Sequence, residues 1–150
     1  MDIENDSPSD LLSAFEAIED DVLWLHAKWK IYRQLFAKSE RRINLLNDFA
    51  PDFFQVVHDS VLYDIFLTIS RLTDPAETWG KKNLTFQRLI RMLEADGRQE
   101  LVNKLTPVLK TAEKKCEAIR PWRNKWIAHK DFGTVCNMIR NPYRALVAKW

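Results

Sequence analysis

The apolar residues between Leu11 and Phe36 recur at alternating spacings of four and three, which is typical of a helix with a heptad seam. Ser7 and Pro8 precede this run and fit an N-cap and a first-turn proline, so a helix is expected to begin there. The seam must pack on another helix, by default one of the same chain. It consists of Leu11, Phe15, Ile18, Val22, Leu25, Trp29, Tyr32 and Phe36.

A second helical pattern extends from Pro51 to Thr73. Phe53 and Val56 are among the residues that widen its apolar face, so we expect this to be the most buried helix. Asp74 precedes a proline and is therefore expected to end it. The intervening segment from Ser39 to Phe49 has no helix breaker, and the sequence leaves open whether it extends the first helix or forms a short second one.

Three polar residues of the second pattern, Asp64, Thr68 and Arg71, fall at i, i+4 and i+7 and therefore share one helix face. Polar groups on a buried helix need hydrogen-bond partners. We expect a structural polar network that fixes helix packing, in preference to direct contact with a substrate.

Shorter helices are expected in the rest of the chain. The polar stretch that leads to Asn83 is interpreted as a loop, and Gly97 is expected to close a helix that begins near Asn83 or Thr85. Another helix should start near Arg98.

Thr106 and Pro107 fit an N-cap and a first-turn proline for a helix that runs through Arg123 and His129. Pro121 interrupts this helix, because it lacks an amide hydrogen and its ring clashes with the preceding turn. A kink, with local unwinding, is expected immediately before Arg123.

Few glycines and no Asn-Gly or Asp-Gly hairpin signal leave strands little support, so the predicted fold class is all-α, a bundle of about four to six helices. A single domain over residues 1–150 is expected, with its core at about 8–131. Residues 132–150 are interpreted as a C-terminal tail with a shortened final helix that starts at Asn141-Pro142.

Charge is distributed unevenly along the chain. Residues 1–21 hold eight acidic and no basic residues, whereas residues 81–130 hold 13 basic and five acidic ones. Such a basic surplus attracts phosphates, although solvated helix faces are the plainer explanation of many lysine-rich stretches. No apolar run is long enough to span a bilayer, and Cys116 and Cys136 read as free thiols, so a cytoplasmic protein without membrane contact is expected.

The segment Arg123-Asn124-Lys125-Trp126-Ile127-Ala128-His129 combines groups suited to phosphate chemistry. Arginine grips two phosphate oxygens at once, histidine moves protons near neutral pH, and Asn124 can orient either partner. The alternative is structural: the tryptophans form a core stripe, while Arg123 and His129 make ordinary hydrogen bonds at its rim.

Other catalytic chemistries find little support. His26, His58 and His129 are far apart in sequence and form no paired metal motif, so no metal and no cofactor are expected. His26 and His58 are interpreted as helix-face residues. Serine and cysteine nucleophile signatures and glycine-rich phosphate loops are absent from the sequence.

The Arg-Asn pair followed by His129 resembles the Arg-polar-x(3 to 5)-His signature of the HEPN superfamily, which comprises helical-bundle RNases and their inactive relatives. Three further blocks are similar to the branch related to the phage abortive-infection U system. They are Asn47-Asp48-Phe49-Ala50-Pro51-Asp52-Phe53-Phe54, Arg71-Leu72-Thr73-Asp74-Pro75 and Asn83-Leu84-Thr85.

This resemblance implies a metal-independent endoribonuclease of toxin or phage-defence type, acting as a homodimer with two Arg-His motifs in one composite cleft. Arg123, Asn124 and His129 would be its catalytic residues. Lys125, Lys130 and Arg120 are the expected RNA-binding residues, and an antitoxin or defence-system protein is the expected partner.

Two alternatives stay open. One is a catalytically silent HEPN module that binds nucleotides or RNA, or serves as an antitoxin-type scaffold. The other is a dimerising interaction protein whose interface is the seam from Leu11 to Phe36.

Overall fold

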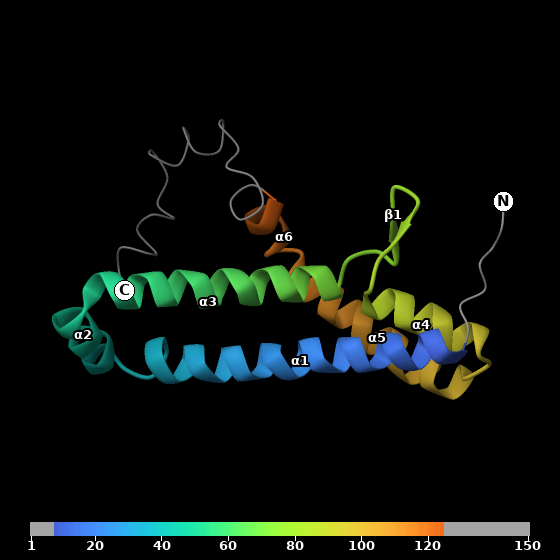
Figure 1. Ribbon diagram of the computed structural model, residues 1–150, viewed down its shortest axis with the longest axis horizontal. Coiled ribbons are helices and arrows are strands. Elements are labelled where there is room, and N and C mark those ends of the chain that lie inside the picture. Colours follow the sequence, from blue (N-terminus) through green and yellow to red (C-terminus); the bar gives the residue numbers. More distant parts are fainter. Residues whose placement is uncertain (1–7, 125–150) are drawn as a thin grey trace. The chain divides into compact units, whose positions relative to one another are not determined.

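The computed structural model describes residues 8–124, which are predominantly helical, as the all-α prediction requires. The helices are α1 (Pro8–Phe36), α2 (Glu40–Phe49), α3 (Pro51–Leu72), α4 (Phe86–Ala95), α5 (Gln99–Cys116) and α6 (Arg120–Trp122) (Figure 1). Between α3 and α4 lies a short antiparallel ribbon of β1 (Glu77–Thr78) and β2 (Lys81–Lys82). None of the helices in the described part of the chain combines the length and apolarity of a membrane span.

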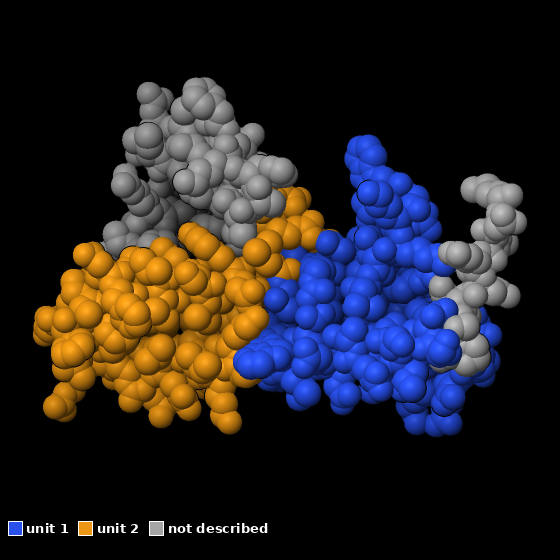
Figure 2. All heavy atoms as spheres, in the orientation of Figure 1, with its two compact units in different colours: residues 1–26, 68–117 blue, residues 27–67, 118–150 orange. Residues whose placement is uncertain are grey.

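The described residues divide into two compact units (Figure 2). Unit 1 contains residues 8–26 and 68–117, and unit 2 contains residues 27–67 and 118–124. Helices α1 and α3 each contribute to both units. The single domain over residues 1–150 stays a prediction.

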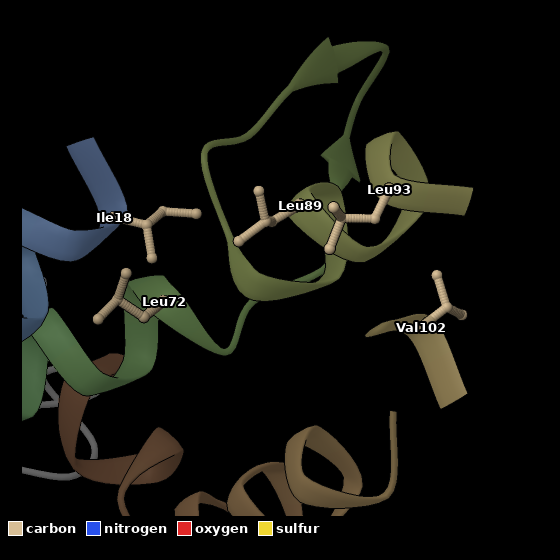
Figure 3. Close-up of a cluster of buried hydrophobic side chains, with 5 residues drawn as sticks. All are labelled: Ile18, Leu72, Leu89, Leu93 and Val102. Atoms are coloured by element: carbon tan, nitrogen blue, oxygen red, sulfur yellow. The ribbon is translucent and has the colours of Figure 1, made fainter. Parts of the chain in front are cut away.

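The core of unit 1 is a cluster of buried aliphatic side chains contributed by α1, α3, α4 and α5 (Figure 3). Leu11, Val22 and Leu25 of the predicted seam pack against this cluster. The seam therefore packs within the chain, but Phe15, at 49% exposure, and Trp29, at 45%, remain largely outside the core. The cluster consists of Ile18, Leu72, Leu89, Leu93 and Val102.

Unit 2 buries aromatic residues of α1 against α3. Tyr32 and Phe36 are 6% exposed, and both rings contact the imidazole of His58. The wide buried face predicted for α3 is wrong at its start, because Phe53 and Val56 are more than 60% exposed. The buried positions of α3 within this unit, His58 and Ile65, form a narrow stripe, and residues beside such a stripe remain in solvent.

Local capping groups define the limits of α2 and α4. The side chain of Ser39 accepts a hydrogen bond from the amide of Arg42 and caps α2. The segment from Ser39 to Phe49 therefore forms a short second helix and does not extend α1. Thr85 caps α4 in the same way, and Gly97, with φ of 74°, follows its end as predicted.

The predicted helix start at Thr106-Pro107 is wrong. Pro107 lies inside α5, which begins at Gln99, and the Thr106 hydroxyl donates to the carbonyl of Val102. The cap-like pair is misleading because a serine or threonine inside a helix can bond to the preceding turn instead.

The chain does not continue as one helix from α5 into Arg123. Helix α5 ends at Cys116, residues 117–119 form a turn, and Pro121 lies in the first turn of α6. A proline ring clashes with the carbonyl four residues earlier, here that of Glu117, so the break precedes the proline by several residues. The interruption is present, but it is earlier and more complete than a kink at Pro121.

Candidate functional site

The Arg123-Asn124 pair directly follows α6. The amide of Arg123 donates to the carbonyl of Ile119 at 3.0 Å, so the turn that carries Pro121 also fixes the backbone of Arg123. Arg123 and Asn124 have π-helical backbone geometry, a widened turn that is frequent at functional sites. The proline break thus separates this pair from α5.

The side chains of the pair bond to each other. Arg123 Nε donates to Asn124 Oδ1 at 2.9 Å, which fixes the guanidinium plane relative to the amide. Arg123 and Arg120 are half-buried, whereas Asn124 is exposed. An arginine held in one orientation is suited to a planar, two-point contact with phosphate oxygens.

The other predicted site residues, His129, Lys125 and Lys130, lie outside the described residues. The structure therefore positions one half of the predicted constellation, Arg123 with Asn124, and the contribution of His129 stays a prediction.

The polar stripe of α3 is bonded to α1. Asp64 forms an ion pair with Lys28 at 2.5 Å in unit 2, and Arg71 forms one with Asp21 at 2.6 Å in unit 1. Thr68 is buried. Contacts of this kind hold two helices in register, while a network that joins all three stripe residues stays a prediction.

His58, interpreted from the sequence as a helix-face residue, lies on α3 and is part of a buried polar cluster in unit 2. It is 7% exposed, its Nδ1 lies 2.9 Å from Asp59 Oδ1, and its Nε2 lies 3.1 Å from the Tyr32 hydroxyl. An ionised carboxylate can only accept, so the Nδ1–H of His58 is the donor toward Asp59, and a neutral ring with this tautomer accepts from the Tyr32 hydroxyl at Nε2. Burial, and next the charge of Asp59, raise the pKa of the Tyr32 hydroxyl, which keeps it protonated.

The sequence does contain a signal for the burial of His58, but a helix pattern that counts apolar residues alone does not include it. Positions 54, 58, 61, 65, 68 and 72 continue at spacings of four and three, and His58, Ile65, Thr68 and Leu72 on this row are buried. The Asp59–His58–Tyr32 chain could relay a proton. In the structure it connects α3 to α1 beside a cavity of about 40 Å³.

A larger groove, of about 330 Å³, lies in unit 1 among α1, α4 and α5. Its lining is apolar, with Phe15, Ile18, Leu89 and Val108 among the side chains, and Glu19 is its charged member. An apolar lining with a carboxylate does not suit a phosphate ligand. The groove therefore does not share the chemistry of the Arg123-Asn124 pair.

An all-α protein with an Arg-Asn pair set apart after a proline break, and a histidine five residues beyond the asparagine, has the features of a HEPN protein. The HEPN_AbiU2 family model, described as AbiU2, matches residues 8–137. The chain belongs to this family, and the match includes the whole predicted motif from Arg123 to His129. Neither the curated proteins nor the solved structures contain a match.

Residues 8–124 contain no group of three or more histidine, cysteine, aspartate or glutamate side chains that could hold a metal ion.

Proposed function

We propose that this AbiU2-family chain is a metal-independent endoribonuclease of abortive-infection type, with Arg123, Asn124 and His129 as catalytic residues. The observation that carries the proposal is the 2.9 Å bond by which Asn124 orients the guanidinium of Arg123, directly after the proline break. A fixed guanidinium stabilises a phosphorane better than a freely rotating one, because no reorganisation is needed during the reaction.

The reaction begins with the ribose 2′-hydroxyl. A base removes its proton, its oxygen forms a bond to the adjacent phosphorus, and the bond from phosphorus to the 5′-oxygen breaks. An acid supplies a proton to that leaving oxygen. The products are a 2′,3′-cyclic phosphate and a 5′-hydroxyl, and unpaired RNA is favoured because its backbone reaches the in-line geometry. Arg123 holds the phosphate oxygens, and His129 transfers protons.

The proposed enzyme is a homodimer. One motif supplies one imidazole, which cannot be base and acid in the same step, so two motifs in a composite cleft complete the site. Unit 2, which contains Arg123, has exposed apolar side chains on α2 and early α3, a feature of interaction surfaces. They are Leu45, Phe49, Phe53 and Val56, each more than 60% exposed.

The proposal is tested by incubating the purified chain with single-stranded RNA in excess chelator. We expect internal cleavage with cyclic-phosphate ends, and the same RNA with one 2′-deoxy substitution at the cut site should resist. Dependence on a divalent ion, a 3′-hydroxyl product, or cleavage of the deoxy-substituted strand would each overturn the mechanism.

The homodimer is tested separately by light scattering on the pure protein at micromolar concentration. We expect a mass twice that of the chain. A mass of one chain throughout would remove the composite cleft and leave a single motif to explain any cleavage.

The silent-module alternative predicts a different result in the chelator experiment: RNA is bound and remains intact. A partner protein fits both proposals. It would inhibit the nuclease in the first, and in the second it would be the active protein that the silent module binds.

A further inference from the structure

The ribbon between α3 and α4 carries an exposed tryptophan at its turn. Trp79 and Gly80 connect β1 to β2, and the indole of Trp79 is 97% exposed. The ribbon extends beyond the end of α3 and the start of α4 (Figure 1). A tryptophan gives up favourable burial when it is left in water, and Trp79 is more exposed than any other large apolar residue in the described part of the chain.

The backbone of this turn is also unfavourable for the residue that occupies it. Trp79 has φ of 57°, and Gly80 has φ of 74°. A two-residue turn with two positive φ angles matches the twist of the strands but favours asparagine or glycine at its first position. A bulky aromatic residue at positive φ is strained, and such outliers are concentrated at functional sites.

The base of the ribbon is held firmly, so the turn is a fixed feature. The side-chain amide of Asn83 donates to the carbonyl of Pro75 at 2.9 Å and to the Thr78 hydroxyl at 2.8 Å. The amide of Ala76 donates to Gln87 Oε1 on α4 at 2.8 Å. The two Asn83 bonds join the two ends of the ribbon to each other. The bond from Ala76, which is fully buried, attaches the ribbon to α4 within unit 1.

Two lysines follow the turn directly in the sequence. Lys81 and Lys82 on β2 are exposed and begin the basic part of the chain, while Glu77 on β1 lies opposite Lys82 in the ribbon register. A flat aromatic surface beside cations is the combination by which proteins bind unpaired nucleotides, since bases stack on the ring and lysines contact the phosphates.

We propose that the Trp79-Gly80 turn, together with Lys81 at the start of β2, is a binding site for single-stranded nucleic acid. Trp79 stacks on one unpaired base, and Lys81 contacts an adjacent phosphate. That the natural ligand is RNA rests on the proposed function, whereas the binding itself does not, because stacking and phosphate contacts need no 2′-hydroxyl.

The test uses a labelled single-stranded DNA of about 12 nucleotides. This probe lacks the 2′-hydroxyl and so remains intact whether or not the chain is a nuclease. Fluorescence anisotropy should show about 10-fold weaker binding for Trp79→Ala, the scale expected for loss of one stacked base, and near wild-type binding for Trp79→Phe. Lys81→Ala should weaken binding and reduce its salt dependence.

The matched control is Trp24→Ala. Trp24 is a 59% exposed tryptophan on α1 in the same unit, but Asp20 and Asp21 precede it by one helical turn, and Lys28, one turn after it, forms an ion pair with Asp64. Its replacement should leave affinity for the oligonucleotide unchanged. Equal weakening by Trp24→Ala and Trp79→Ala would overturn the assignment to this turn.

Two other ligands, duplex DNA and a lipid surface, are distinguished from an unpaired strand by the same variant. Unchanged affinity for the oligonucleotide in a folded Trp79→Ala variant overturns the proposal. The proposal is also wrong if Trp79→Ala weakens binding of a blunt duplex to the same extent, because the bases of a duplex are already stacked on one another. If Trp79→Ala loses binding to anionic phospholipid vesicles but keeps the oligonucleotide, the turn contacts membranes and the proposal is wrong. Trp79-dependent binding by a chain that cleaves no RNA supports this site and overturns only the nuclease.

Discussion

Replacing His129 by alanine is expected to lower the rate of RNA cleavage by about 10²-fold or more, the usual loss when a positioned general acid or base is removed. The rate of the unchanged protein should depend on pH near neutrality, where an imidazole changes its protonation state. Single-turnover cleavage of an end-labelled RNA in chelator gives the rate directly. Far-UV circular dichroism checks that the helices are retained.

The matched control for this experiment is His26→Ala. His26 is an exposed residue of α1 that has no part in the proposed site, so its removal should leave both rate and pH dependence unchanged. A His129→Ala variant that keeps most of the wild-type rate would show that the proton transfers use other groups. The Asp59–His58–Tyr32 chain would then be the next candidate for these proton transfers.

The sequence predicts the helices well where the signal is local. The four-three spacing and Pro8 predict α1, Pro51 and the proline after Asp74 limit α3, and Gly97 marks the end of α4. Caps and periodicity act within a few residues of the position they determine, so they can be recognised without any knowledge of tertiary contacts.

Predictions that depend on packing are less successful. The same spacing includes the half-exposed Phe15 and Trp29 along with the buried Ile18, because a period gives a face but not the width of the surface that covers it. The four-three row of α3 places His58 on the buried face, but Tyr32, which hydrogen-bonds to its ring, is distant in sequence, and no local pattern encodes that bond.

The ribbon between α3 and α4 is not predicted, because its turn lacks the usual hairpin signal. The turn contains Trp79-Gly80 instead of the asparagine or aspartate before glycine that the backbone prefers. A function that requires an exposed indole would account for that departure, since functional sites are where local preferences are most often overridden.

The candidate site likewise has one part that the local sequence predicts and another that depends on contacts distant in sequence. Arg123, Asn124 and their separation from α5 by Pro121 follow from residues adjacent in sequence, and the structure adds the bond between the two side chains. A composite cleft depends on a second chain, which no spacing within one chain specifies.

Arg123→Lys is expected to reduce RNA cleavage nearly as far as Arg123→Ala, by about 10²-fold, the scale for loss of a preorganised transition-state contact. Lysine keeps the charge but lacks the planar fork that binds two phosphate oxygens, and it has no Nε–H in position to bond to Asn124. Single-turnover rates at saturating RNA measure this effect independently of binding. Arg120→Lys is the matched control, since Arg120 is also half-buried and its proposed contact with RNA needs only a positive charge. Retention of most activity by Arg123→Lys, or equal losses in both lysine variants, would mean that Arg123 supplies diffuse charge and that its bond to Asn124 has no role in catalysis.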